Sequence, residues 1–280
     1  MRLLDLFSGI GGFSLGLERS GAFKTVAFCE IEPYCQKVLA KHWPQVPIYD
    51  DVRTITAERL AADGITVDAI CGGFPCQDIS CAGKGAGLEG ERSGLWFEYA
   101  RIIGELRPQY VIVENVSALL SRGLDQVLGT LASLGYDAEW HCIPASAVGA
   151  PHIRDRMWIV AYSQSSNCGN VGKDIWKASR EINTLSNASS FSGRDDKPDN
   201  RQSLANPMRS GLERHRNCTV GIEKAYASFS GSCWWSVEPN VGRVANGVPA
   251  RSHRLKALGN AVVPQIPELI GRAIAAREAA

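Results

Sequence analysis

The sequence predicts an α/β fold in which a mainly parallel sheet carries helices on both of its faces. Short apolar runs alternate with longer amphipathic ones through residues 1–161, a pattern typical of parallel strands joined by crossover helices. A glycine-rich turn follows the first apolar run, and Glu30 ends the second run about twenty residues later. These three observations indicate a Rossmann-like sheet with a ligand site at the carboxyl ends of its strands.

The individual elements follow from this alternation, taken in chain order. Apolar runs too short for a helix are interpreted as strands, and stretches with apolar residues three or four positions apart as helices. The predicted strands are Leu3–Phe7, Val26–Glu30, Val67–Cys71, Tyr110–Val113 and Trp158–Ala161. Helices are predicted through Leu15–Glu18 and over Tyr34–Lys41, Ser93–Leu106, Leu124–Leu134 and Val262–Ala280.

Length and composition limit the class of protein. The chain has 280 residues, of which 45% are hydrophobic, enough for one large domain with an accessory lobe. No stretch approaches about 20 consecutive apolar residues, and Asp5 interrupts the first apolar run. We therefore expect no membrane span or signal peptide and a cytoplasmic location. Nine cysteines, an odd number, favour thiols over a disulfide framework.

The charge and the amino-acid composition change after the last predicted strand. The whole chain carries a net charge of +1, whereas residues 162–252 contain 12 Lys or Arg against 8 Asp or Glu. From Ser163 the sequence is rich in Ser, Asn, Gly and Arg, with few periodic apolar positions. Such a stretch cannot build much core of its own, so we expect a small irregular region between two parts of a folded domain.

The glycine-rich turn lies within Asp5–Phe13. It places backbone N–H groups and the positive end of a helix at the top of the sheet. Its spacing, Gly9-x-Gly11-Gly12, departs from the dinucleotide pattern G-x-G-x-x-G. Glu30, at the end of the next strand, can bind the two hydroxyl groups of a ribose. We therefore expect an adenosine-bearing cofactor, the alternative being an ordinary tight turn and a solvated glutamate.

A thiol and a carboxyl group are predicted at the same edge of the sheet. Cys76 lies in the run Gly72–Asp78, directly after an apolar strand, where paired glycines and a proline present a side chain rather than bury it. Glu114 ends the next predicted strand. A nucleophile beside an acid suggests covalent chemistry. Because Cys71, Cys76 and Cys81 lack the spacing of zinc ligands and have no histidine nearby, we expect no metal.

Taken together, these motifs resemble those of the C5-cytosine DNA methyltransferases, bacterial and phage enzymes that use S-adenosylmethionine. The resemblance covers most of the chain and leaves out only the stretch from about Tyr162 to Asn240. Eight motifs occur in family order: Asp5–Gly12, Glu30, Asp50–Val52, Gly73–Gln77, Arg92–Trp96, Glu114–Val116, Arg154–Arg156 and Leu258–Pro264.

The resemblance implies an organisation for the whole chain. Residues 1–161 would form the catalytic and cofactor-binding domain, with a Rossmann-like S-adenosylmethionine-dependent methyltransferase fold. Residues 162–250 would be a small irregular target-recognition region, the alternative being an insertion without a recognition role. Residues 251–280 would return to the catalytic domain. The glycine-rich stretch Ser80–Gly90 resembles the loop that closes over a base rotated out of the duplex.

The resemblance also implies catalytic roles. Cys76 would add to C6 of cytosine, Glu114 would hold or donate a proton at N3, and Asn115 would anchor the Glu114 loop. Arg156 would contact the base oxygen O2 and Arg154 would support it. For Glu114 the alternative is a strand-end glutamate that caps a helix, and for either arginine it is a surface salt bridge.

For the cofactor, the resemblance places Phe7 against adenine, Glu30 on the ribose and Asp51 at the adenine amino group, with Asp50 as the alternative to Asp51. The complete set implied for S-adenosylmethionine, or its product S-adenosylhomocysteine, is Phe7, Ser8, Gly9, Ile10, Gly11, Gly12, Glu30, Ile31, Asp51, Val52, Pro75, Leu95, Asn260 and Val262. For Leu95 and Val262 the alternative is a core position, as is usual for apolar residues at helical spacing.

The partner implied is double-stranded DNA, bound by a monomer whose cognate restriction endonuclease, if there is one, acts separately. Gln77, Ser80 and Arg92 would contact the DNA. His152 stands where the family often has glutamine. Two other functions remain: a tRNA cytosine-5 methyltransferase with the same chemistry, and a catalytically inactive nucleic-acid binder. The second is disfavoured because Cys76, Glu114, Arg156 and the cofactor loop occur together.

Overall fold

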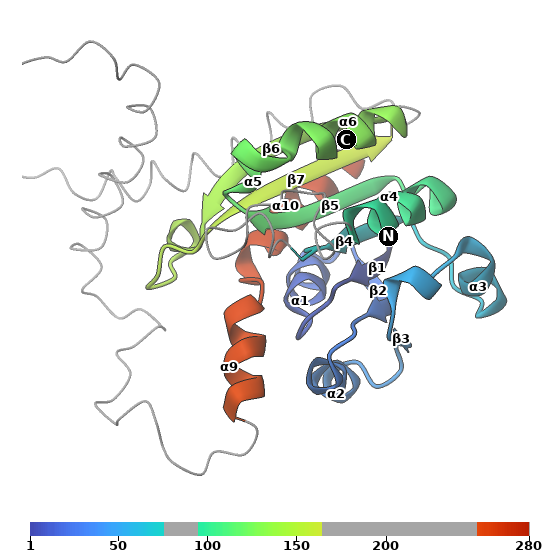
Figure 1. Ribbon diagram of the computed structural model, residues 1–280, viewed down its shortest axis with the longest axis horizontal. Helices are drawn as coiled ribbons and strands as arrows, with labels where there is room; N and C mark the ends of the chain where they lie inside the picture. The colour runs from blue at the N-terminus through green and yellow to red at the C-terminus, as the bar shows by residue number, and fades with distance from the viewer. Residues whose placement is uncertain (76–94, 164–250, 280) are drawn as a thin grey trace, which may run out of the picture.

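The computed structural model of the chain describes residues 1–75, 95–163 and 251–279. Within these ranges it contains a seven-stranded sheet in the order β3-β2-β1-β4-β5-β7-β6 (Figure 1). The strands are β1 (Arg2–Leu6), β2 (Lys24–Cys29), β3 (Ile48–Tyr49), β4 (Ala69–Gly72), β5 (Tyr110–Val116), β6 (Tyr136–Pro144) and β7 (Asp155–Ser163). Every pairing from β3 through β5 is parallel, and β7 runs antiparallel to both β5 and β6. The predicted mainly parallel α/β fold is confirmed.

Helices cover both faces of this sheet, as predicted. They are α1 (Gly12–Arg19), α2 (Pro33–His42), α3 (Ala57–Ala62), α4 (Leu95–Leu106), α5 (Leu119–Arg122), α6 (Leu124–Ser133), α9 (Arg251–Asn260) and α10 (Gln265–Glu278). Two short 3₁₀ turns, η1 (Val52–Thr54) and η3 (Ala145–Val148), complete the described elements. None of the helices in the described part of the chain combines the length and apolar character needed to cross a membrane.

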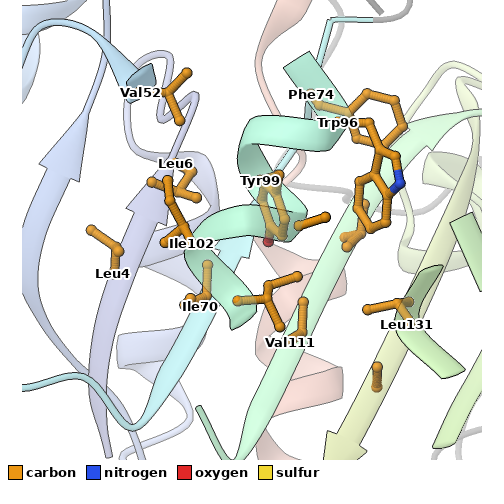
Figure 2. Packing of buried hydrophobic residues seen from close by; sticks show 14 of the residues in the cluster. Leu4, Leu6, Val52, Ile70, Phe74, Trp96, Tyr99, Ile102, Val111 and Leu131 are labelled. Carbon is orange, nitrogen blue, oxygen red and sulfur yellow. The ribbon is translucent and has the colours of Figure 1, made fainter. Parts of the chain in front are cut away.

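Alternate residues of the strands divide the core into two layers, because successive side chains of a strand point to opposite faces. On one face, α3, α4, α5 and α6 pack on residues such as Ile70 and Val111. Figure 2 shows Trp96, Tyr99 and Ile102 of α4 among these strand side chains. On the other face, α1 and α10 pack on the remaining positions of β1, β4, β5 and β7. Burial on both faces explains why the parallel strands read as nearly continuous apolar runs.

The order of the strands reverses direction at β1. From β1 the chain moves outward to β2 and β3, and then crosses back to β4 on the other side of β1. In open α/β sheets, ligands bind outside the carboxyl ends of the strands at such a reversal. The glycine turn after β1, the acidic end of β2 and the turn after β4 all meet at this edge.

The C-terminal segment returns to the sheet. Helix α10 packs so closely on α1 that a Cβ atom added to Gly16 would lie 2.1 Å from the carbonyl oxygen of Pro264. At its far end, the hydroxyl of Tyr110 donates a 2.6 Å hydrogen bond to Glu278. The predicted single helix from Val262 is therefore wrong at its start, since α10 begins only after Pro264, which is its N-cap residue.

Several elements were not predicted from the sequence: β3, β6, α3, α5, α9 and the two 3₁₀ turns. Helix α9 has a single buried residue, Ala257, so it lacks the apolar periodicity by which a helix is recognised. Strand β6 lies at the end of the sheet and leaves Asp137, Trp140 and His141 exposed. Strand β7 is longer than expected and ends at Ser163, two residues beyond the boundary predicted for the first domain. The predicted Ser80–Gly90 loop and nearly all of region 162–250 lie outside the described residues.

Candidate active site

The turn after β1 has a backbone conformation that can bind an anion or a nucleotide. Phe7, Gly9 and Gly11 all have positive φ angles, of 54°, 55° and 83°. The Ser8 hydroxyl donates a 2.6 Å hydrogen bond to the carbonyl of Asp5 and so fixes the turn on the strand. A Cβ atom added to Gly9 would meet nothing within 4 Å. The glycine turn thus borders open space at the positive end of α1.

Glu30 faces this turn from the end of β2. One carboxyl oxygen accepts a 2.6 Å hydrogen bond from the backbone N–H of Gly9, and the other accepts a 2.8 Å bond from that of Glu32. Burial raises the pKa of Glu30, and these two donors oppose the shift. The carboxyl group is therefore fixed next to the glycine turn, in the place that a ribose-binding acid requires.

An unusually exposed apolar side chain lies beside Glu30. The next residue, Ile31, is 68% exposed although it is large and hydrophobic. An exposed isoleucine next to a held carboxyl group and an open glycine turn fits a ligand with an apolar ring and a sugar. The described residues therefore fit an adenosine-bearing group at this edge.

The two aspartates expected near the cofactor, Asp50 and Asp51, follow β3 directly. The Asp51 carboxyl accepts a 2.9 Å hydrogen bond from the backbone N–H of Arg53 and caps η1. Val52 is buried in the core, whereas Asp50 is exposed. Both aspartates lie at the same edge, so either can reach a ligand there, and Asp51 is the more firmly held of the two.

Phe7 and Leu95 face the core layer under α4. The Phe7 ring stacks on Tyr99 with centroids 6.3 Å apart and an interplanar angle of 10°. Leu95 packs, partly buried, against the same cluster. Their packing fits the core alternative as well as a cofactor wall, because both side chains are only partly covered.

The turn after β4 is fastened to β5. Asn115 is buried, and its side-chain amide donates a 3.2 Å hydrogen bond to the carbonyl of Phe74 and accepts a 2.8 Å bond from the N–H of Val116. Pro75 is the last described residue of this turn. Cys76, Gln77, Ser80 and Arg92 lie outside the described residues. The point at which the chain reaches Cys76 is thus fixed by the residue that follows Glu114.

Glu114 forms an ion pair with Arg156. The antiparallel pairing of β5 with β7 sets Val116 opposite Arg156, and Arg156 Nε lies 3.0 Å from Glu114 Oε1. Burial raises the pKa of Glu114, while the charges of Arg156 and Arg154 lower it. The site therefore holds a desolvated acid and a guanidinium group side by side, the arrangement that can bind a ring nitrogen and its neighbouring carbonyl together.

Arg154, although only two residues from Arg156, has different partners. Its terminal nitrogens Nη1 and Nη2 donate hydrogen bonds of 2.8 Å each to the carbonyls of Gly259 and Ala261. These residues flank Asn260, which is exposed at the end of α9. No sequence pattern indicated these contacts, because they join segments that are far apart along the chain.

Cysteines of the described core are poor candidates for chemistry. Cys29, Cys35 and Cys71 are buried. Burial raises the pKa of Cys29 to about 12 and that of Cys35 to about 11, so both remain thiols near neutral pH. In residues 1–75, 95–163 and 251–279, no cluster of three His, Cys, Asp or Glu side chains could hold a metal ion.

The described part of the chain thus belongs to the class of Rossmann-like α/β proteins, with an open glycine turn beside a held acid and a buried acid paired with an arginine at the carboxyl ends of its strands. The family model described as C-5 cytosine-specific DNA methylase matches residues 1–247, and the chain belongs to this family. The predicted resemblance is confirmed, and membership of the family implies S-adenosylmethionine as the cofactor.

Individual relatives agree with this assignment. The chain is 36% identical over 169 residues to the type II methyltransferase M2.BsuMI of Bacillus subtilis, covering 58% of this chain and 42% of that protein. It is 35% identical over 172 residues to M.DsaV of Dactylococcopsis salina, covering 60% and 47%. A solved structure described as an E. coli DNA modification methyltransferase encoded within a prophage matches with a TM-score of 0.54, 26% identity and coverage of 62% and 50%. The chain thus spans about half or less of the length of these relatives.

Proposed function

We propose that this chain is a DNA (cytosine-5-)-methyltransferase that transfers a methyl group from S-adenosylmethionine to C5 of cytosine in duplex DNA. The observation that carries the proposal is the Glu114–Arg156 pair, with 3.0 Å between Oε1 and Nε, at the edge of the sheet where the chain enters Cys76. The name of the matching family and those of its type II relatives support DNA as the substrate. They give no support to the tRNA alternative.

The cofactor would lie across the carboxyl ends of β1, β2 and β3. Glu30 would accept hydrogen bonds from the ribose hydroxyls, Ile31 would cover the adenine ring, and Asp51 would accept from the adenine amino group. The glycine turn would bind the methionine end through its N–H groups. When bound, S-adenosylmethionine supplies an electrophilic methyl group and leaves as S-adenosylhomocysteine.

At the base, Glu114 and Arg156 would act together. The carboxyl group would hold a proton at N3, which neutralises charge on the ring as a nucleophile adds to C6. Because burial raises the pKa of Glu114, a protonated form is accessible nearer to neutral pH. Arg156 would donate to O2 and, as a permanent cation, keep the acid oriented.

The nucleophile is proposed from the sequence. The Cys76 thiolate would form a bond to C6, which makes C5 nucleophilic enough to accept the methyl group. Loss of the C5 proton to a base would then restore the double bond and expel the thiolate, so no oxidant or reductant is consumed. A free thiol titrates near ~8.5, so we expect the site to lower the pKa of Cys76.

The target base must leave the duplex to reach such a site. We propose that residues 162–250 read the target sequence, as their excess of Lys and Arg over acidic residues and their Asn and Ser content suggest. The protein would act as a monomer in the cytoplasm of a bacterial host, with any cognate endonuclease working separately.

The test measures transfer of labelled methyl groups to duplex DNA and, in parallel, to tRNA. Transfer to cytosine of DNA alone supports the proposal, and transfer to tRNA alone overturns it.

Glu114→Gln should lower kcat by about 10² to 10⁴, whereas Glu98→Gln, which alters a partly exposed surface pair with Arg101, should not. Cys76→Ser should abolish turnover but keep cofactor binding, and duplex DNA containing 5-fluorocytosine should trap the wild-type protein covalently.

A further inference from the structure

Arg154 forms two hydrogen bonds with the backbone at the end of α9. Both of its terminal nitrogens donate to backbone carbonyls, those of Gly259 and Ala261, at 2.8 Å each. Carbonyls at the C-terminal end of a helix carry partial negative charge and lack partners within the helix. A planar guanidinium group can satisfy two of them at once in a fixed geometry, whereas a lysine ammonium group cannot.

The backbone that presents Arg154 is itself constrained. Its φ angle is 35°, in the left-handed region that non-glycine residues rarely adopt. The N–H of Ala145 donates to the carbonyls of Ile153, at 2.7 Å, and Arg154, at 3.3 Å, and ties this turn to η3. The side chain is thus directed toward α9 by a turn that is fastened on its other side.

The segment to which Arg154 donates its hydrogen bonds also contacts the end of the glycine turn. A Cβ atom added to Gly12, the first residue of α1, would lie 2.5 Å from the carbonyl oxygen of Val262. Residues 259–262 are therefore held between Arg154 on one side and α1 on the other. The proposed cofactor residues Asn260 and Val262 belong to this segment, so its position decides whether they can reach a ligand.

Two other side-chain contacts of α9 do not involve the backbone carbonyls at its C-terminal end. The His253 ring stacks on Tyr34 with centroids 6.0 Å apart, and Lys256 pairs with Glu32. Both contacts join α9 to the start of α2. Among the described residues, Arg154 is the side chain shown to bind the carbonyls at the end of the helix.

We propose that Arg154 is a positioning residue that holds segment 259–262 against the glycine turn and so couples cofactor binding to the Glu114–Arg156 pair. The inference rests on the proposed function for the identity of the cofactor. It separates the two arginines: Arg156 serves the base, and Arg154 serves the far wall of the cofactor pocket. Because Arg154 immediately precedes β7 and Arg156 is the second residue of this strand, cofactor binding would steady the strand that carries Arg156.

The test compares Arg154→Ala and Arg154→Lys with wild-type protein. Calorimetric titration with S-adenosylhomocysteine, without DNA, should show affinity at least tenfold weaker for Arg154→Ala and an intermediate loss for Arg154→Lys, because lysine restores a single donor at one carbonyl. Backbone amides of residues 259–263 should exchange hydrogen faster in both variants. Arg272→Ala, which removes an exposed partner of Glu268 on α10, is the matched control and should change neither quantity.

Two results would overturn the proposal. One is wild-type cofactor affinity and exchange in Arg154→Ala together with a fall in kcat, which would place Arg154 at the base instead. The other is unaltered affinity in Arg154→Lys when Arg154→Ala does not fold. Wild-type protein that binds S-adenosylhomocysteine but methylates no DNA would contradict the proposed function and leave this binding test intact.

Discussion

Gly73 leaves room for the carboxyl group of Glu114: a Cβ atom added to Gly73 would lie 2.9 Å from Glu114 Oε2. The atom that would clash is the end of a side chain, so the fold can adapt by turning the carboxyl group aside. Its other oxygen, however, is held by Arg156. A methyl group at this position would therefore disturb the acid and its partner before it disturbed the core.

This contact predicts that Gly73→Ala lowers activity without unfolding the protein. We expect kcat to fall by about 10- to 100-fold, since small displacements of a catalytic group are costly, while the free energy of unfolding changes by less than about 1 kcal/mol. Steady-state kinetics and urea denaturation measure the two effects. Gly129→Ala, with nothing within 4 Å of the added atom, is the control, and equal activity of the two variants would contradict the contact.

The exposure of Ile31 predicts that a substitution there weakens cofactor binding without lowering the free energy of unfolding. Because this side chain is 68% exposed, Ile31→Ala should change the free energy of unfolding by no more than about 0.5 kcal/mol. If the side chain covers the adenine ring, its loss should weaken S-adenosylhomocysteine binding by about tenfold, or about 1.4 kcal/mol. Trp140→Ala, at the other end of the sheet on β6, should leave the affinity unchanged. Equal affinities for all three proteins would remove Ile31 from the site.

Asp5 predicts a dependence of stability on pH. The side chain is fully buried and accepts a 2.7 Å hydrogen bond from Ser14, and burial raises its pKa from 3.8 to about 7. The folded protein therefore binds this proton more tightly than the unfolded chain, so stability should decline as pH rises from about 4 to 7. In Asp5→Asn this contribution is absent.

The comparison is made by urea denaturation at pH 5 and pH 8. Relative to wild type, Asp5→Asn should gain about 2 kcal/mol between the two pH values. Other titrating groups cancel in this difference because both proteins contain them. A constant difference across the range would show that Asp5 keeps an ordinary pKa.

The close approach of α1 and α10 predicts a large effect at Gly16. An added Cβ atom would lie 2.1 Å from the backbone oxygen of Pro264 and 2.8 Å from Pro267 Cγ, and a backbone atom cannot turn aside. Gly16→Ala should therefore destabilise the protein by about 1 to 3 kcal/mol, although alanine is intrinsically the better helix former. Thermal unfolding with Gly129→Ala for comparison measures this, and a stabilised Gly16→Ala would show that the helices can separate freely.

Much of the fold could be predicted from the sequence, because strands buried on both faces appear as apolar runs and the glycine turn marks the first crossover. Strand β6 was missed because an edge strand with exposed residues such as Trp140 has no such run. Helix α9 was missed because only Ala257 is buried. The Glu114 and Arg156 motifs could be located in the sequence. The different contacts of Arg154 and Arg156 could not be predicted, since the partners of Arg154 lie more than a hundred positions away.

The wall at residues 259–262 has a consequence for biosynthesis. The glycine turn, Glu30 and the acid–arginine pair all emerge from the ribosome well before α9 and α10. A nascent chain therefore possesses one side of the cofactor pocket long before the other. On the proposed function, tight binding of S-adenosylmethionine would wait until α10 has docked on α1, so an incompletely synthesised chain would not methylate DNA.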